Sequence, residues 1–318
     1  MTTSLVGMVS VPKTHPIPQL SIVVPIQRDL AGFESTLISV LENQPSGSEV
    51  LVSHDGSYDD PFELCEEVRF VVAESTRLVD LVGAAARQAR GRYVHVLGDG
   101  LRATCGWTDD ALEHFDHFDT AAVAPVIRAA ANRRVLSAGW STTSTSICSP
   151  VSHGEESPRI ETRIAAYLQA SFWRRDVLRS LHQSFEGSDS LEASFVYHHL
   201  IRKAGWRTEL SPNSTVECDS ETIPWECRSF KRGLRLRAIR NHFVGGGWSE
   251  SITAGCLGVL SSLLQPSRML ESAGQCFAPL AESNLARQIQ CDEVATCDDE
   301  GMIVSLPKKT GTSCRRAA

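Results

Sequence analysis

The sequence predicts an α/β fold with a mixed, mainly parallel sheet and helices on both faces. Short apolar runs of strand length recur in the first third of the chain, at residues 22–24, 50–52, 70–72 and 93–97. Segments with helical spacing of apolar residues, or rich in alanine, separate several of these runs. Strands that alternate with helices in this way favour parallel pairing through right-handed crossovers.

Residues 21–57 form the unit around which the rest is organised. The first apolar run ends at Pro25, a segment with helical periodicity follows, and the second run ends in the polar turn His54-Asp55-Gly56-Ser57. In open α/β sheets, ligands bind outside the carboxyl ends of the strands. Pro25-Ile26-Gln27 and Asp55-Gly56-Ser57 leave those ends, so we expect them to line a nucleotide pocket, although any doubly wound domain has such turns.

The other elements follow in chain order. An alanine-rich helix is expected over 78–90 before Gly91, and the strand 93–97 runs into Gly98-Asp99-Gly100. The Ser/Thr-rich stretch 141–150 is interpreted as an inert connection in preference to a mobile lid. The remaining expected elements are a helix over 107–118, a strand over 121–127, a hairpin over 132–140, strand structure over 160–172, helices over 174–181 and 191–204, and a short strand over 206–210 before Pro212.

Four regions are expected along the chain. Residues 1–18 form a flexible lead, 19–247 the main domain, 248–281 C-terminal helices, and 282–318 a largely disordered tail. Residues 226–243 are rich in basic side chains. A solvated helix is the favoured interpretation of this stretch, and a patch facing a phosphate or an anionic membrane is the alternative. Its basic residues are Arg228, Lys231, Arg232, Arg235, Arg237 and Arg240.

Composition excludes several classes of protein. The chain of 318 residues has a net charge of -7 and no long basic run, which argues against non-specific nucleic-acid binding. Its ten cysteines form no C-x-x-C pair, which argues against a zinc ribbon. No secretory pattern and no apolar run of the ~18 residues that a membrane span needs is present. A cytoplasmic protein is expected, with peripheral contact to the inner face of a membrane left open.

The order of IVVPIQ, LISVLENQ, EVLVSHDGS and ARGRYVHVLGDG resembles the family-2 type of GT-A glycosyltransferases. The later stretches RRVLSAG, FWRR, KAGWR and AIRN are similar to further landmarks of that family, so the resemblance covers about residues 20–245. It implies a GT-A-like nucleotide-diphospho-sugar transferase fold. It also implies inverting transfer of a sugar from a nucleotide-diphosphate donor to a hydroxyl of an unknown glycan, lipid or protein acceptor.

The resemblance also implies the site residues. Pro25, Gln27, Asp55, Ser57 and Arg77 are expected to bind the nucleotide sugar, with turn capping as the alternative role of Asp55. The family binds Mg²⁺ or Mn²⁺ through an Asp-x-Asp motif, because these ions prefer carboxylate and phosphate oxygens. Here Gly98 and Gly100 stand at the two acidic positions. Asp99 is therefore the candidate metal ligand, and a plain tight turn is the alternative.

The family's catalytic base is displaced in this chain as well. Ala193 and Ser194 stand where a Glu-Asp pair is expected, so Glu192 is the candidate base, with Asp189 and the histidines 198–199 as weaker candidates. Two main hypotheses follow: an active glycosyltransferase, or a catalytically degenerate binding module or partner subunit. A nucleotidyltransferase is a third, weaker reading. An acid within reach of the groove beside Asp55 would favour the enzyme.

Overall fold

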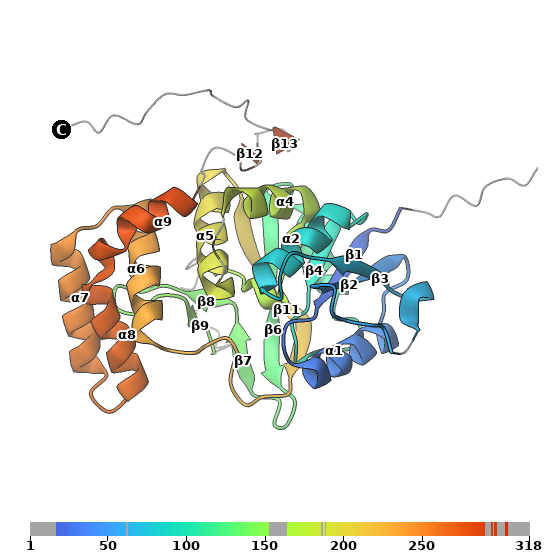
Figure 1. Cartoon of the computed structure of the whole chain (residues 1–318), viewed down its shortest axis with the longest axis horizontal. Coiled ribbons are helices and arrows are strands. Elements are labelled where there is room, and N and C mark those ends of the chain that lie inside the picture. Colours follow the sequence, from blue (N-terminus) through green and yellow to red (C-terminus); the bar gives the residue numbers. More distant parts are fainter. Residues whose placement is uncertain are drawn as a thin grey trace, which may run out of the picture.

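The computed structural model describes residues 17–61, 63–152, 164–185, 187, 189–289, 294, 296–297 and 303–304. One large sheet forms the centre of the molecule, and helices cover both of its faces (Figure 1). Four further helices, α6 to α9, pack together beside α5 at one side of the sheet, where Figure 1 draws them in orange and red. The predicted α/β class with a mixed sheet is confirmed.

The sheet has nine strands in the order β3-β2-β1-β4-β10-β6-β11-β5, with β7 paired to β6. The first four strands of the chain, β1 to β4, are parallel to one another. Strand β10 is antiparallel to both β4 and β6, and β11 is parallel to β6. The strands are β1 (Leu20–Pro25), β2 (Ser48–His54), β3 (Arg69–Val72), β4 (Tyr93–Val96), β5 (Leu101–Ala103), β6 (Thr120–Ala129), β7 (Val135–Ala138), β10 (Phe172–Arg174) and β11 (Arg207–Cys218).

Side chains alternate between two cores, one on each face of the sheet. In β1, Val23 belongs to the core under α2, α4 and α5, whereas Ile22 and Val24 belong to the core under α1 and α3. This is the period of two that places successive side chains of a strand on opposite faces. The helices are α1 (Leu30–Glu42), α2 (Leu78–Gln88), α3 (Asp109–Glu113), α4 (Arg175–Ser184) and α5 (Ser190–Lys203), and the short 3₁₀ helices are Leu64–Glu66, His114–Asp116, Leu168–Ala170 and Ala278–Leu280.

Several expected elements differ from the structure. The helix expected over 107–118 is only α3 followed by a 3₁₀ turn. Pro212 does not end its strand, because a register shift between Ser211 and Thr215 lets β11 continue past it. The stretch 141–150 closes as a hairpin, with β8 (Trp140–Ser141) paired to β9 (Ser149–Pro150). Within 160–172, the described part begins at residue 164 and contains a 3₁₀ turn and the start of β10.

The C-terminal helices are α6 (Phe230–Val244), α7 (Trp248–Ser261), α8 (Pro266–Cys276) and α9 (Glu282–Gln288). The two helices expected over 248–281 are therefore present. Helix α9 lies in the range expected to be a tail, and its Leu285 is buried in the main core. Most residues after 289 lie outside the described part, which adds only the pair β12 (Thr296–Cys297) and β13 (Ile303–Val304).

Helices α6 and α8 touch through their backbones. A Cβ atom on Gly233 would lie 1.8 Å from the carbonyl oxygen of Glu271, and one on Gly274 would lie 2.1 Å from that of Phe230. Only glycine permits such an approach, so the two helices are locked at this crossing. In the part of the chain that the structure describes, no helix is long and apolar enough to cross a membrane.

Candidate functional site

The polar turns that follow β1 and β2 lie side by side. The backbone N–H of Ile26, just after β1, donates a hydrogen bond of 2.7 Å to the carbonyl oxygen of Ser53 near the end of β2. Since β1 is parallel to β2 and β4, the carboxyl ends of all three strands open on one edge of the sheet. We call this edge the strand-end rim. It brings Pro25, Gln27 and Asp55 to the same side of the molecule.

Asp55 and Ser57 bind each other at this rim. The backbone N–H and the hydroxyl of Ser57 donate to Asp55 Oδ1 at 3.0 Å and 2.6 Å, which is the geometry of a capped turn. These hydrogen bonds hold the pKa of Asp55 below its ordinary value. Both residues are exposed. Asp55 therefore has the turn-capping role that the sequence left open, while its carboxylate still faces solvent.

Asp99 follows β4 and turns toward the loop between β1 and α1. Burial raises the pKa of its carboxyl to about 7, although hydrogen bonds from the backbone and side chain of Gln27 and from the backbone of Arg28 lower it. Its Oδ1 is buried without a hydrogen-bond partner among the described residues. Gly100, the next residue, has a φ of 76°, which fits a tight turn. The structure thus brings Asp99 and Gln27 together.

The residues after β4 do not fit an Asp-x-Asp metal site. Magnesium and manganese need several oxygen ligands, of which carboxylates are the main protein contribution. Gly98 and Gly100 offer no side chain, and the nearby Asp29 accepts a hydrogen bond from Gly32 as the cap of α1. The described ranges contain no group of three or more His, Cys, Asp or Glu side chains that could hold a metal ion.

A pocket of about 530 Å³ lies between the start of α2, the start of α5 and the start of α6. We call it the rim pocket, because two hydrogen bonds connect it to the end of β4. Just after β4, Gly98 N donates to Gln169 O at 2.8 Å, and Gln169 Nε2 donates at 2.6 Å to Oγ of Ser190, which lines the pocket. The N-cap residues of all three helices line it. Its charged lining residues are Arg77, Asp189, Glu192, Lys231, Arg232 and Arg235.

Glu192 and Arg77 lie in this pocket, but Glu192 is fully engaged. Its side chain is 7% exposed, and Arg235 contacts both carboxylate oxygens, with 2.5 Å between Nη2 and Oε2. Burial raises the pKa of Glu192, and the Arg235 guanidinium opposes that shift. Accepting a proton would require Arg235 to release one oxygen. Arg77 is half exposed and pairs with Asp80 at 2.7 Å.

Asp189 is the exposed carboxylate of the rim pocket. Its Oδ1 accepts hydrogen bonds from the backbone N–H groups of Leu191 and Glu192, at 3.0 Å each, and so caps α5. Sequence reasoning placed it on a preceding loop, behind Glu192 as a candidate. An aspartate followed by a helix-forming run is an N-cap signal. That signal would have placed its carboxylate at the start of α5.

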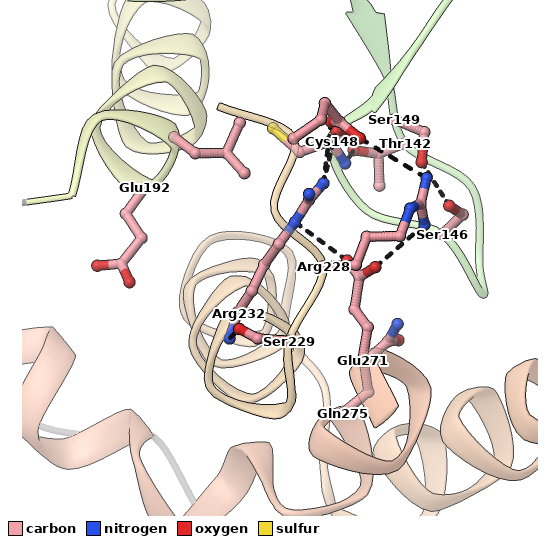
Figure 2. Close-up of polar contacts among 12 residues, drawn as sticks. Thr142, Ser146, Cys148, Ser149, Glu192, Arg228, Ser229, Arg232, Glu271 and Gln275 are labelled. Atoms are coloured by element: carbon pink, nitrogen blue, oxygen red, sulfur yellow. Dashed lines mark hydrogen bonds and ion pairs between the residues drawn. The ribbon is translucent and has the colours of Figure 1, made fainter. Parts of the chain in front are cut away.

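Other arginines of the basic stretch form a buried cluster with two glutamates. Arg232 Nη2 lies 3.1 Å from Glu226 Oε1, its Nε lies 3.1 Å from Glu271 Oε1, and Arg228 Nη1 lies 3.0 Å from Glu271 Oε2. Figure 2 shows both arginines reaching Glu271, and Arg232 also reaching the backbone oxygen of Cys148 in the 140–150 hairpin. The solvated-helix interpretation is wrong for Arg232 and also for Arg237, which is 2% exposed.

The two histidines of α5 line a different cavity, of about 640 Å³, together with Trp140, Phe243 and Arg240. Burial lowers the pKa of His199 to about 4, and Arg202 and Arg240 act in the same direction. Its ring stacks on that of Phe243, with 4.9 Å between centroids. The histidines are therefore packed away from the carboxylates of the rim pocket.

Comparison with known proteins gives matches through structure alone. No protein-family model and no curated protein matches the sequence. The mannosyltransferase PcManGT from Pyrobaculum calidifontis, solved with GDP-Man and Mn²⁺, is 16% identical over 85% of this chain and 74% of its own, with a TM-score of 0.43. TarS of S. aureus, residues 1–349 solved with UDP, is 13% identical over 84% and 91%, with a TM-score of 0.49.

GalNAc-T7, solved with UDP, GalNAc and Mn²⁺, reaches a TM-score of 0.51 at 15% identity over 84% of this chain. The chain spans 56% of the length of GalNAc-T7. At this identity the likeness concerns the fold. Together with the strand order of the mixed sheet, it confirms the predicted fold of the GT-A glycosyltransferases.

Proposed function

We propose that this chain, which has the fold of the GT-A glycosyltransferases, is a glycosyltransferase that uses a nucleotide-diphosphate sugar. The observation that carries the proposal is the rim pocket, which places cationic side chains and the exposed carboxylate of Asp189 beside the strand-end rim. Cations suit a diphosphate, and a carboxylate suits proton removal from an acceptor hydroxyl. Similar structures bind GDP-Man and UDP, which supports the same class of donor here.

In this proposal the strand-end rim holds the nucleoside. Pro25 and Gln27 flank one side of it, and the exposed carboxylate of Asp55, fixed by Ser57, accepts hydrogen bonds from ribose hydroxyls. Arg77, at the start of α2, faces the diphosphate from the adjoining pocket. The volume of the pocket lies within the usual range for small-molecule sites.

The transfer is proposed to invert the sugar. The acceptor oxygen forms a bond to the anomeric carbon while the bond from that carbon to the donor phosphate oxygen breaks, and the nucleoside diphosphate leaves with the electron pair. A carboxylate takes the acceptor proton. Asp189 suits this role better than Glu192, because both oxygens of Glu192 are held by Arg235. Asp189 is exposed and already oriented by two backbone N–H groups.

A degenerate binding module is the second candidate. The two glycines at the acidic positions after β4 and the Glu192–Arg235 pair favour it, since both remove a familiar catalytic group. Such a module would bind the nucleotide and leave the sugar untransferred. It would then act as a partner of an active transferase.

Two measurements test the proposal. Calorimetric titration with UDP and GDP reports binding, and release of UDP or GDP from UDP-sugars and GDP-sugars in the presence of candidate acceptor sugars and lipids reports turnover. Binding with acceptor-dependent release supports the glycosyltransferase. Binding without release identifies the degenerate module. Failure of both nucleotides to bind, with and without Mn²⁺, would rule out both candidates.

We also propose that α7 contacts a lipid bilayer. Its outer surface and the turn after it expose large apolar side chains, although an exposed helix face is ordinarily polar. Glu250 is the one charged residue of α7. Vesicle sedimentation tests the contact: wild-type protein should sediment with vesicles, and a Leu260→Ser and Leu264→Ser double variant should remain in solution. The exposed residues are Trp248, Ile252, Leu257, Leu260, Leu263 and Leu264.

A further inference from the structure

We infer that the cationic side chains of the rim pocket neutralise the donor's diphosphate, in place of a carboxylate-bound divalent cation. The inference rests on the proposed nucleotide-diphosphate donor. It concerns Arg77, Lys231 and Arg235, which come from the starts of α2 and α6. These elements lie far apart in the sequence and meet only in the fold.

The first step is the charge of the pocket. Its lining has four cationic side chains and two carboxylates, a formal balance of +2. The diphosphate of a nucleotide sugar carries two negative charges, and the leaving nucleoside diphosphate carries more. A divalent cation bound by two carboxylates would bring no net charge to such a site. Arg77 and Arg232 also pair with carboxylates outside the lining, Asp80, Glu226 and Glu271. Lys231 therefore supplies charge that no ion pair between described residues offsets, and Arg77 and Arg235 would exchange a carboxylate for the phosphate of the leaving group.

The second step is which of these cations are free to act. Arg232 is committed to the buried cluster with Glu226 and Glu271. Lys231 is exposed, and none of the ion pairs between described residues involves it. Lys231 is near enough to Glu192 to lower the pKa of that carboxyl. Its ammonium group is thus positioned at the pocket and available to a phosphate.

The third step is the backbone. The N-cap residues Arg77, Asp189 and Ser229 place the first turns of α2, α5 and α6 around the pocket. The N-terminus of a helix carries partial positive charge and favours phosphate groups. The side chains of Asp189 and Ser229 already cap α5 and α6, so the start of α2, which has no side-chain cap, is the end whose N–H groups are open to a phosphate.

The fourth step is the pair between Glu192 and Arg235. Glu192 neutralises Arg235 when no phosphate is bound, through contacts to both carboxylate oxygens. Guanidinium groups bind phosphate with the same two-point geometry that they use for carboxylate. A diphosphate would therefore compete with Glu192 for Arg235. Because of this competition, Glu192 should lower the affinity for a diphosphate, whereas the cationic side chains should raise it.

The experiment is calorimetric titration of the full chain with pyrophosphate, UDP and GDP, each in EDTA and each in Mn²⁺. Pyrophosphate probes the diphosphate site without depending on the nucleoside. We expect pyrophosphate and at least one of the two nucleotides to bind in EDTA, with dissociation constants within about threefold of those in Mn²⁺. Binding of pyrophosphate and nucleotides only in Mn²⁺ would overturn the inference and leave the proposed donor class intact.

Two variants with opposite expected effects locate the site. Lys231→Gln should weaken pyrophosphate about tenfold, the scale of one hydrogen bond to a charged group. Glu192→Gln should tighten pyrophosphate severalfold, because it frees Arg235. Lys203→Gln is the matched control: it removes an exposed lysine at the other end of α5, and it should leave the affinity unchanged.

The outcomes separate the inference from the function. If pyrophosphate binds in EDTA, and the two variants change its affinity in the expected directions, the inference is supported. If no sugar transfer accompanies that binding, the proposal that the chain is an enzyme is ruled out. Metal-free binding that neither variant alters places the diphosphate elsewhere and overturns the inference. A gain of affinity cannot come from misfolding, so an unchanged or weakened Glu192→Gln variant also counts against it.

Discussion

The strand-end rim and the rim pocket adjoin each other but differ in charge. At the strand-end rim, Asp55 closes a turn with Ser57, and Asp99 faces the loop between β1 and α1. In the rim pocket, Lys231 is free of ion pairs among the described residues, and Asp189 is exposed. Asp55 and Asp189 are both exposed and both accept hydrogen bonds from their own backbone, so the two regions differ in the cationic side chains that line the rim pocket.

This difference underlies our proposal that cationic side chains hold the diphosphate without a metal motif. The acidic positions after β4 are glycines, so no carboxylate pair is available there. In our proposal, the positive charge that a metal would bring comes instead from Arg77, Lys231 and Arg235 in the rim pocket. The following predictions test this division of roles, from the largest expected effect to the smallest.

Asp189→Asn should lower acceptor-dependent release of nucleotide by about 10²- to 10⁴-fold, the range attributed to general base catalysis. Asparagine keeps the backbone hydrogen bonds that cap α5, so nucleotide affinity should stay within about twofold. Turnover and calorimetry on the same preparation check both statements. Asp176→Asn, which alters an exposed aspartate of α4, serves as the control. Equal turnover of the Asp189 variant and wild type would assign the base elsewhere.

Glu271→Ala should destabilise the fold by about 3–5 kcal/mol, because it leaves Arg232 and Arg228 partly unpaired in a buried place. Chemical denaturation measures this change in the free energy of unfolding. Glu113→Ala, at an exposed position of α3, should cost less than about 0.5 kcal/mol. A small effect at Glu271 would mean that the buried cluster does not hold α6 in place.

Asp99→Asn should raise stability at pH 8 by about 4 kcal/mol and change it little at pH 4. The pKa of Asp99 is about 7 in the fold against 3.8 as its ordinary value, so the folded state binds the proton more tightly. Stability from this group is complete below pH 4 and is lost as the pH rises through 7. Denaturation at both pH values measures it. Stabilisation of the wild type, but not the variant, by Mn²⁺ at pH 8 would instead assign Asp99 to a metal.

Asp55→Ala should weaken UDP or GDP about fivefold and leave pyrophosphate affinity unchanged, since the strand-end rim is proposed to hold the nucleoside alone. Calorimetry with both ligands measures the contrast. Asp116→Ala, at an exposed position of the 3₁₀ turn after α3, is the control. An equal loss of affinity for pyrophosphate and for the nucleotide would mean that the strand-end rim and the rim pocket form one site.

The sequence predicted the sheet and the strand-end rim well, because both follow from local patterns. The apolar runs gave the parallel strands, and the polar turns at Pro25 and Asp55 lie at one rim, as adjacent parallel strands require. The proline in β11 misled the prediction, since a bulge is invisible to a propensity argument. The short 3₁₀ turn after α3 was equally hidden by its helical spacing.

The rim pocket was not predictable in the same way. It requires the starts of α2, α5 and α6 to converge, and no local pattern reports such a contact. Helical spacing did show that the basic residues of α6 point in several directions. It did not show that Arg232 would be neutralised inside while Lys231 and Arg235 face a pocket. For the same reason, it did not show that Arg235 would hold both carboxylate oxygens of Glu192, the candidate base.

The close contact of α6 and α8 at their glycines limits where this chain can be truncated. Gly233 and Gly274 let α8 brace the helix whose first turn carries Lys231. A fragment ending at residue 247, where the sequence pattern suggests a domain boundary, would leave that helix without its brace and Arg232 without Glu271. We therefore expect the sheet and its helical extension to unfold as a single cooperative unit, so that shortened versions should lose stability throughout the sheet together with the rim pocket.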